Sequence, residues 1–345
     1  MNERYSRQEL FAGIGPEGQA RLARARALIV GCGALGCALA DTLVRAGVGT
    51  VRIADRDFVE WSNLNRQVLF DEADARERRP KARAAAARLR AINSAVRVEG
   101  LITDVSPDTV EPLVTAADVV LDATDNFETR YLLNDACVKH GKPWIYGAAV
   151  GSHGATMTIL PNETPCLRCV FEEPPDAAGA PTCETAGVIL PIILTVAAAQ
   201  AVEAIKLLAG QSALCRRSLW QMDVWTGKQA TLALPAERRR SDCPCCQLRR
   251  FEFLAAERAS LAVVLCGRQA VQVRPAQAGE TALDFARLAE RLARAGAGTA
   301  RYNADILILA ADGLEATLFR DGRAIIKGTS SLAEARAFYA KRFGM

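Results

Sequence analysis

A glycine-rich turn near the amino terminus has the composition of a phosphate-binding loop. It contains Gly31, Gly33, Ala34 and Gly36, between a short apolar run and a segment with helical spacing. Glycines permit a tight turn and a close approach of the backbone, and the amino end of a helix attracts phosphate. Asp55 ends the next apolar run, where a carboxylate can hold ribose hydroxyl groups. Alone, these residues describe a nicotinamide- or flavin-dependent enzyme equally well.

Polar residues farther along the chain favour a triphosphate over a dinucleotide. The set comprises Ser62, Asn63, Arg66, Lys81, Asp125 and Asn126. Lys81 follows a proline that marks a helix start, and a lysine in a first turn opposes the helix dipole unless an anion is bound there. Two cations and an aspartate around one nucleotide suit ATP with magnesium. The polar set therefore predicts a nucleoside triphosphate site.

Two cysteine pairs have the C-x-x-C spacing of a zinc site. Cys166 and Cys169 form the first pair, and Cys243 and Cys246 form the second. Each pair can hold one tetrahedral zinc ion with two thiolates, and two pairs complete a closed structural site. Cys245 lies inside the second pair, so it can substitute for a neighbour. We expect a zinc ion that ties the second pair to the body of the protein.

Alternating apolar runs and helical patterns must position these residues. Residues 27–54 have the pattern strand, turn, helix and strand, which is a βαβ unit and predicts a parallel sheet. The alternation continues to about residue 160, where the last two strands are expected to be antiparallel. The predicted fold is a Rossmann-like, doubly wound, mainly parallel α/β sheet. Such sheets bind ligands beyond the carboxyl ends of their strands.

The second half of the chain adds a helix and a small domain. A Pro/Gly/Ala-rich loop at 172–181 precedes a long apolar helix expected from about 184 to 208. A polar linker at residues 236–246 follows, and from about residue 261 onward a second series of short strands and helices is expected. We expect two domains: residues 1–250, which bind the nucleotide, and residues 255–345, a small α+β domain whose role the sequence leaves open.

Composition excludes several classes of protein. The 345 residues carry 43 Lys and Arg against 39 Asp and Glu, and these charges are scattered, so there is no basic stripe for nucleic acid. The amino-terminal residues are charged and do not resemble a signal peptide. The most apolar stretch is interrupted by Pro191 and Gln200, which favours a buried helix over a membrane span. We therefore expect a cytoplasmic protein without nucleic-acid or membrane partners.

Taken together, the motifs resemble the ubiquitin-activating superfamily in its bacterial form, the MoeB, ThiF and HesA adenylyltransferases. The resemblance covers about residues 1–250. The motifs that carry it are RYSRQ from residue 4, GCGALGC from residue 31, ADRD from residue 54, SNLNRQ from residue 62, Pro80-Lys81, and DATDN from residue 122. It implies ATP-dependent adenylation of the C-terminal glycine of a ubiquitin-like sulfur carrier that ends in Gly-Gly, with release of pyrophosphate.

The resemblance also implies roles for individual residues. They are Asp55 for the ribose, Asn63, Arg66 and Lys81 for the phosphates, and Asp125 for magnesium with Asn126 beside it. Arg7 matches the arginine that the family contributes across a homodimer interface. The four paired cysteines match the family's zinc ligands. Ala34 is a departure, because MoeB-type turns usually carry glycine there.

Three alternatives remain open. Cys183 directly precedes the apolar helix, whose dipole can lower the pKa of a thiol, so it can attack an acyl adenylate. The protein would then form a thioester and pass the carrier to a partner thiol, or take part in persulfide chemistry with a sulfur donor. An NAD-dependent oxidoreductase explains Asp55 and the glycine turn but neither Arg66 nor Lys81. A scaffold with a vestigial site does not explain the intact polar set.

Overall fold

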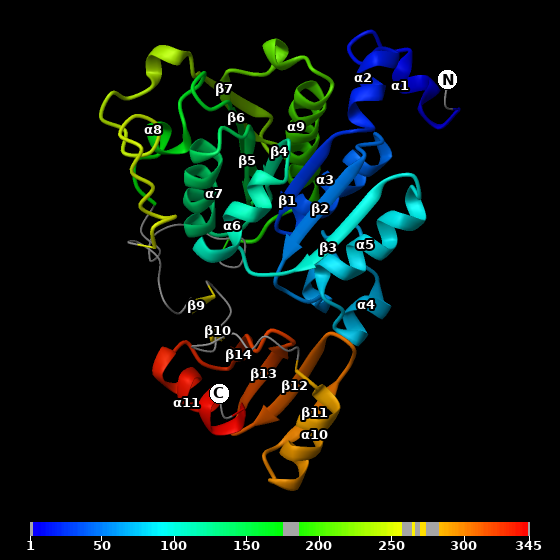
Figure 1. The fold of residues 1–345 in the computed structure, drawn as a ribbon, viewed down its shortest axis with the longest axis vertical. Coiled ribbons are helices and arrows are strands. Elements are labelled where there is room, and N and C mark those ends of the chain that lie inside the picture. Colours follow the sequence, from blue (N-terminus) through cyan, green and yellow to red (C-terminus); the bar gives the residue numbers. More distant parts are fainter. Residues whose placement is uncertain (1–2, 175–185, 257–263, 266–269, 274–282, 344–345) are drawn as a thin grey trace. The chain divides into compact units, whose positions relative to one another are not determined.

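The computed structural model describes residues 3–174, 186–256, 264–265, 270–273 and 283–343 (Figure 1). The chain divides into two compact units, Met1–Ala259 and Ser260–Met345. The first unit holds every residue for which the sequence predicts a site. The second has a sheet and a hydrophobic core of its own.

An eight-stranded mixed sheet forms the centre of the first unit, in the order β3-β2-β1-β4-β5-β6-β7-β8. Strands β1 to β5 are parallel, and β6, β7 and β8 continue the sheet antiparallel. The strand order reverses direction between β1 and β4, and ligands of open α/β sheets bind at such a switch point. The strands are β1 Arg26–Val30, β2 Thr50–Asp55, β3 Arg97–Ile102, β4 Val119–Asp122, β5 Trp144–Val150, β6 His153–Ile159, β7 Ser218–Asp223 and β8 Lys228–Ala233.

Helices cover both faces of this sheet. Helices α3, α5 and α9 pack on one face, and α6 and α7 pack on the other (Figure 1). Alternate strand residues supply the two cores: Ile29 points into the first, and Leu28 and Val30 point into the second. The helices are α1 Ser6–Glu9, α2 Gly15–Leu22, α3 Ala34–Arg45, α4 Glu72–Glu77, α5 Lys81–Ile92, α6 Pro107–Thr115, α7 Phe127–Lys139, α8 Leu167–Val170 and α9 Leu190–Leu208.

Helix α9 starts later than expected. The predicted start at about residue 184 is wrong, because residues 186–189 are not helical and the helix begins at Leu190. Gly187 has a φ of +70°, which a right-handed helix does not allow, and Pro191 occupies the first turn, where proline is favoured. Among the described residues, α9 alone is long and apolar enough to cross a membrane, but it packs against β5, β6 and α3 as a core helix does.

In its described residues, the second unit has a six-stranded antiparallel sheet and two helices. Its strand order is β11-β12-β13-β14-β10-β9, and α10 and α11 share one hydrophobic core with the sheet. Its elements are β9 Val264–Leu265, β10 Ala270–Val273, α10 Phe285–Arg294, β11 Thr299–Tyr302, β12 Ile306–Ala311, β13 Leu314–Phe319, β14 Ala324–Lys327 and α11 Leu332–Phe343. This is the α+β composition that the sequence predicts.

Candidate functional site

The glycine-rich turn joins β1 to α3 at the carboxyl edge of the sheet. Gly31 has a φ of +92°, and a Cβ there would lie 2.6 Å from the carbonyl oxygen of Ala123. A Cβ on Gly36 would lie 2.0 Å from the carbonyl oxygen of Gly31. The protein's own packing therefore requires glycine at both positions.

Gly33 is different, because the surrounding protein does not require it. Its φ of −76° suits any residue, and a Cβ there would have only the amide nitrogen of Gln67 within 4.0 Å among the described residues. Gly33 is also the N-cap of α3, where it offers no side chain to the first backbone N–H groups. The open space and the unsatisfied donors form a cradle that can accept an anion.

Asp55 lies beside this turn in a fixed orientation. One carboxylate oxygen accepts the backbone N–H of Cys32 at 2.5 Å, and the other accepts the backbone N–H of Asp57 at 2.6 Å. Burial raises the pKa of Asp55, and Lys81 acts in the opposite direction. The carboxylate is thus held at the end of β2, where the sequence places a ribose ligand.

Lys81 is the first residue of α5 and is almost fully buried. Its Nζ lies 3.5 Å from a carboxylate oxygen of Asp57, and its backbone N–H donates to the carbonyl oxygen of Asp57 at 2.9 Å. A lysine in the first turn of a helix needs a nearby negative charge, and in this structure the carboxylate of Asp57 provides it. The ammonium group remains at the same edge of the sheet as Asp55.

The segment from Trp61 to Gln67 lies beside the glycine-rich turn, and we call it the second wall of the site. Asn63 is buried, and its side-chain oxygen accepts the backbone N–H of Glu60 at 3.0 Å. The half-buried Arg66 donates to the carbonyl oxygen of Ser62 at 2.6 Å. Gln67 is buried beside Gly33, and its side-chain oxygen has no hydrogen-bond partner among the described residues. The sequence indicates no separate role for Gln67, although it ends the SNLNRQ motif.

Asp125 and Asn126 follow β4 at the same edge. Asp125 is exposed, whereas the side-chain oxygen of Asn126 caps α7 by accepting the backbone N–H of Thr129 at 2.8 Å. Arg130 fixes this loop through two contacts. Its guanidinium donates to the carbonyl oxygen of Thr124 at 2.7 Å and lies 3.2 Å from a carboxylate oxygen of Asp122. The sequence does not predict the contact between Arg130 and Asp122, because nothing in it shows that both charged side chains are buried.

The donor chemistry of this edge fits magnesium. Asp125 offers exposed carboxylate oxygens after β4, and Asp104 follows β3 at the same carboxyl edge of the sheet. Carboxylate oxygens together with phosphate oxygens are the ligands that Mg²⁺ prefers.

The four paired cysteines come together at one point. Their sulfur atoms all lie within 4.8 Å of one another, with separations of 3.9 Å for Cys166–Cys169, 3.6 Å for Cys166–Cys243 and 3.4 Å for Cys169–Cys246. A tetrahedral zinc ion with Zn–S bonds of about 2.3 Å requires sulfur separations of about 3.8 Å. The geometry and the thiolate chemistry both fit zinc. Cys245 is not a member of the cluster, because its sulfur accepts the side-chain N–H of Asn134 at 3.2 Å.

The structure does not bring Arg7 to this site. Arg7 is exposed on α1, which the Gln8 side chain fastens to the carbonyl oxygen of Ala46, at the carboxyl end of α3. Figure 1 shows α1 at the amino ends of the strands, across the sheet from the glycine-rich turn. Cys183 lies outside the described residues. Helix α9 begins at Leu190, seven residues after Cys183 rather than directly after it, and the expected effect of the helix dipole on this thiol stays a prediction.

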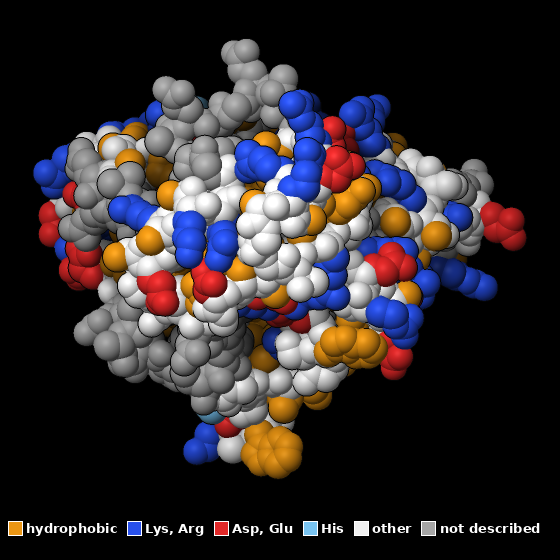
Figure 2. Space-filling view, turned by 90° about the horizontal axis from the view of Figure 1, so that it is seen from below, with side chains coloured by type: hydrophobic (Ala, Val, Ile, Leu, Met, Phe, Trp, Pro, Cys, Tyr) orange, Lys and Arg blue, Asp and Glu red, His pale blue; other side chains and the backbone are white. Residues whose placement is uncertain are grey.

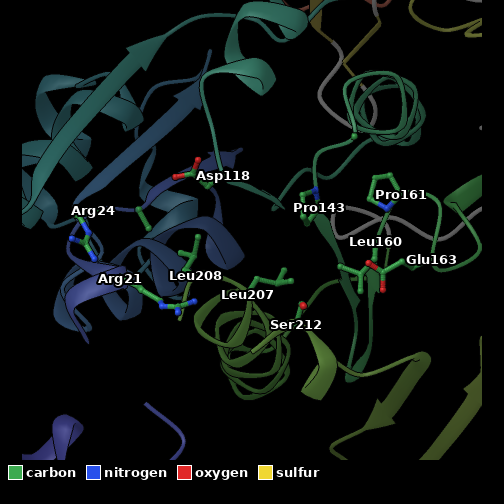
Figure 3. Close-up of a pocket in the computed structure, with 12 residues that line it drawn as sticks. Arg21, Arg24, Asp118, Pro143, Leu160, Pro161, Glu163, Leu207, Leu208 and Ser212 are labelled. Atoms are coloured by element: carbon green, nitrogen blue, oxygen red, sulfur yellow. The ribbon is translucent and has the colours of Figure 1, made fainter. Parts of the chain in front are cut away.

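A cavity of about 540 Å³ opens at the amino edge of the sheet, away from the predicted site residues. Arg21, Arg24, Asp118, Leu160 and Leu207 are among its lining residues (Figure 3). None of the residues that the sequence singles out lines it. On the face shown in Figure 2, basic and acidic side chains of the described residues are interspersed.

Known proteins resemble this chain, one of them over its whole length. The model of the ThiF family matches residues 5–245. The Bacillus subtilis (strain 168) protein named sulfur carrier protein ThiS adenylyltransferase is 48% identical over 344 residues, which are 100% of both chains. The Escherichia coli K12 protein of the same name is 39% identical over 244 residues, 70% of this chain and 94% of that one.

A solved structure supports the fold. Escherichia coli MccB with ATP superposes with a TM-score of 0.62 at 23% identity, covering 71% of this chain and 75% of that chain. At that identity the likeness concerns the fold alone. It agrees with the predicted Rossmann-like sheet.

Proposed function

Because this chain belongs to the ThiF family, we propose that it catalyses the ATP-dependent adenylation of the C-terminal glycine of a ubiquitin-like sulfur-carrier protein. One structural observation supports this most directly. The open cradle at Gly33, the fixed carboxylate of Asp55, the buried Lys81 and the exposed Asp125 share the carboxyl edge of one sheet at its switch point. A nicotinamide-dependent oxidoreductase would account for Asp55 and the glycine-rich turn, but not for Arg66 or Lys81.

The reaction follows from this arrangement. A carboxylate oxygen of the carrier attacks the α-phosphorus of ATP, the bond to the β-phosphate oxygen breaks, and pyrophosphate leaves an acyl adenylate. The chain's contribution is to position the reactants and to neutralise charge on the phosphates. Magnesium held by Asp125 would supply further neutralisation when bound.

Each predicted residue receives a proposed task from its place. Asp55 binds the ribose hydroxyl groups, and Asn126 holds the turn that presents Asp125. Lys81 exchanges its contact with Asp57 for a phosphate oxygen. Arg66 and Asn63 lie on the second wall with Gln67, whose side-chain oxygen has no partner among the described residues and is available to the nucleotide. The glycine-rich turn, with Ala34, and the residue Ser62 form the rest of the proposed nucleotide site.

We propose a structural role for zinc. Cys166, Cys169, Cys243 and Cys246 would hold the ion and fasten the polar link after β8 to α8. No step of the reaction passes through this site.

We propose that the active form is a homodimer in the cytoplasm. Arg7 is at the wrong edge of its own sheet to reach its own nucleotide site, so it can serve only the site of another copy. Leu10 and Phe11, which follow it, are 69% and 65% exposed in the single chain. The exposed face of α9 also carries Leu194 and Val202. Unpartnered apolar side chains next to Arg7 favour a contact between copies.

The conjugation-type alternative depends on Cys183. There the thiolate would attack the acyl adenylate, AMP would leave and a thioester would form. A Cys183→Ser variant tests this: loss of carrier transfer with adenylation intact would support it, and unchanged transfer would discard it.

The decisive experiment is ATP–pyrophosphate exchange with magnesium against a panel of carriers that end in Gly-Gly. We expect exchange with one carrier, which would identify the substrate. Arg66→Ala and Asp125→Ala should abolish exchange without unfolding the chain, and the exposed Arg76→Ala on α4 is a matched control that should not change it. Retained exchange in both site variants would refute the proposed roles, and no exchange with any carrier would refute the proposed function.

A further inference from the structure

Gln67 is buried beside the glycine-rich turn, yet its side-chain amide makes no hydrogen bond to any described residue. The residue is only 4% exposed. Its backbone is fixed on both sides, because its N–H donates to the carbonyl oxygen of Asn63 at 2.9 Å and its carbonyl oxygen accepts the N–H of Phe70 at 3.1 Å. The backbone of the second wall therefore places the amide, and the amide contributes no hydrogen bond to that wall.

A buried glutamine ordinarily uses its amide, as Gln200 on α9 does. The side-chain nitrogen of Gln200 donates to the carbonyl oxygens of Asp122 at 2.9 Å and of Ile145 at 3.1 Å. A buried amide without a partner has lost its hydrogen bonds to water and has gained none in the protein, so it destabilises the fold. The amide of Gln67 is in this position, and a bound group that completes its hydrogen bonds would remove the destabilisation.

The amide nitrogen of Gln67 lies on the side of the cradle. Apart from the chain neighbours of Gly33, it is the one described atom within 4.0 Å of the position that a Gly33 Cβ would occupy. Gly33 is the N-cap of the 12-residue helix α3 and offers no side-chain acceptor to the first backbone N–H groups. These groups attract an anion. The Gln67 nitrogen adds one more donor for the same anion without adding a charge.

We propose that the side-chain N–H of Gln67 donates to a phosphate oxygen of the nucleotide at the amino end of α3, and that the free protein carries this amide unpaired for that contact. This inference rests on the proposed function. Hydrogen bonds to a charged acceptor are shorter and stronger than those between neutral groups. Because the protein itself makes no use of the amide, removing it should weaken nucleotide binding without lowering stability.

The test compares ATP affinity with thermal stability in the full-length chain. Isothermal titration calorimetry measures Mg·ATP binding, and circular dichroism measures the melting temperature without nucleotide. Gln67→Met keeps the length of the side chain and removes both polar groups. It should bind Mg·ATP about 10- to 100-fold more weakly and melt no lower than wild type. Gln67→Glu replaces the donor by a carboxylate oxygen and should bind Mg·ATP more weakly still, because like charges repel.

Gln200→Met is the matched control. Gln200 is also fully buried and also has an amide oxygen without a partner among the described residues, but its nitrogen donates to two backbone carbonyl groups. The same substitution there should lower the melting temperature, because two buried carbonyl oxygens lose a donor. A structural role for Gln67 would produce the same fall in Gln67→Met.

The proposal is overturned if Gln67→Met binds Mg·ATP within about twofold of wild type. It is also overturned if Gln67→Met fails to fold or melts as far below wild type as Gln200→Met does, or if wild type binds no Mg·ATP. Exchange with the carrier panel is measured separately on wild type. A chain that binds Mg·ATP and loses affinity in the Gln67 variants, but exchanges with no carrier, would refute the proposed function and leave this inference standing.

Discussion

Lys81 and Asp57 are joined twice, once through the backbone and once through their side chains. The backbone N–H of Lys81 donates to the carbonyl oxygen of Asp57 at 2.9 Å, and the ammonium nitrogen lies 3.5 Å from an Asp57 carboxylate oxygen. The amino end of α5 is thereby fastened to the loop after β2. A buried lysine is held, with a counter-ion, at the edge where the nucleotide is proposed to bind.

Replacing Asp57 by asparagine should destabilise the protein unless ATP is present. The substitution removes the charge that faces an almost fully buried ammonium group. Because Asp57 itself is 19% exposed, we expect a loss of roughly 1–3 kcal/mol in the free energy of unfolding, below the value for a fully buried pair. Mg·ATP should raise the melting temperature of Asp57→Asn more than that of wild type, since phosphate replaces the missing anion.

Thermal melting with and without Mg·ATP measures both effects. Asp41→Asn is the control, because Asp41 pairs with Arg45 on the exposed side of α3 and such surface pairs contribute at most about 1 kcal/mol. An Asp57→Asn protein that melts as wild type does, with the same response to ATP, would contradict this role for the pair.

Zinc removal should loosen the first unit without altering the nucleotide residues. We expect one zinc ion per chain by elemental analysis, and loss of that ion in Cys243→Ser with a lower melting temperature. Cys245→Ser is a stringent control, since Cys245 lies between two ligands in the chain but its sulfur contacts Asn134 instead. Zinc that survives in Cys243→Ser but is lost in Cys245→Ser would show that the ligand set is wrong.

A chain that ends at Ala256 should fold and retain ATP–pyrophosphate exchange. Both cores of the first unit are built from residues before this point, and the second unit has a separate core. Circular dichroism melting tests the folding, and exchange with the cognate carrier tests the activity. Unfolding, or a loss of exchange at saturating carrier, would show that the second unit is needed for the catalytic fold.

Local patterns in the sequence predict much of the fold. The βαβ pattern expected in residues 27–54 is confirmed, with its helix at Ala34–Arg45, because glycines mark the start of this helix and its apolar spacing is regular. Strands β7 and β8 have no counterpart among the expected elements. Every residue of β8 is exposed, so it lacks the apolar alternation that marks a half-buried strand.

The motif residues of the site are predictable from the sequence, but their partners are not. Asp55 and Lys81 stand out by type and spacing. Arg56 lies inside a quoted motif, yet its environment depends on Asp104, 48 residues away. Likewise, only the structure shows that the buried side-chain oxygen of Gln67 has no hydrogen-bond partner among the described residues, where the glycine-rich turn lies beside the second wall. Such relationships arise from strand order, which local periodicity does not encode.

The proposed role of Arg7 can be tested by mixing two inactive variants. Arg7→Ala and Arg66→Ala should each lose exchange. If Arg7 serves the partner's site, a mixed dimer contains one site with both arginines intact, and random reassociation should restore about a quarter of the wild-type activity. Restoration requires that subunits exchange, which a brief dilution and reconcentration of the mixture allows. Mixing Arg66→Ala with Asp125→Ala is the control, because both residues belong to one chain's site and no intact site can form. If equal mixtures of Arg7→Ala and Arg66→Ala stay inactive while labelled subunits demonstrably exchange, Arg7 does not act across an interface.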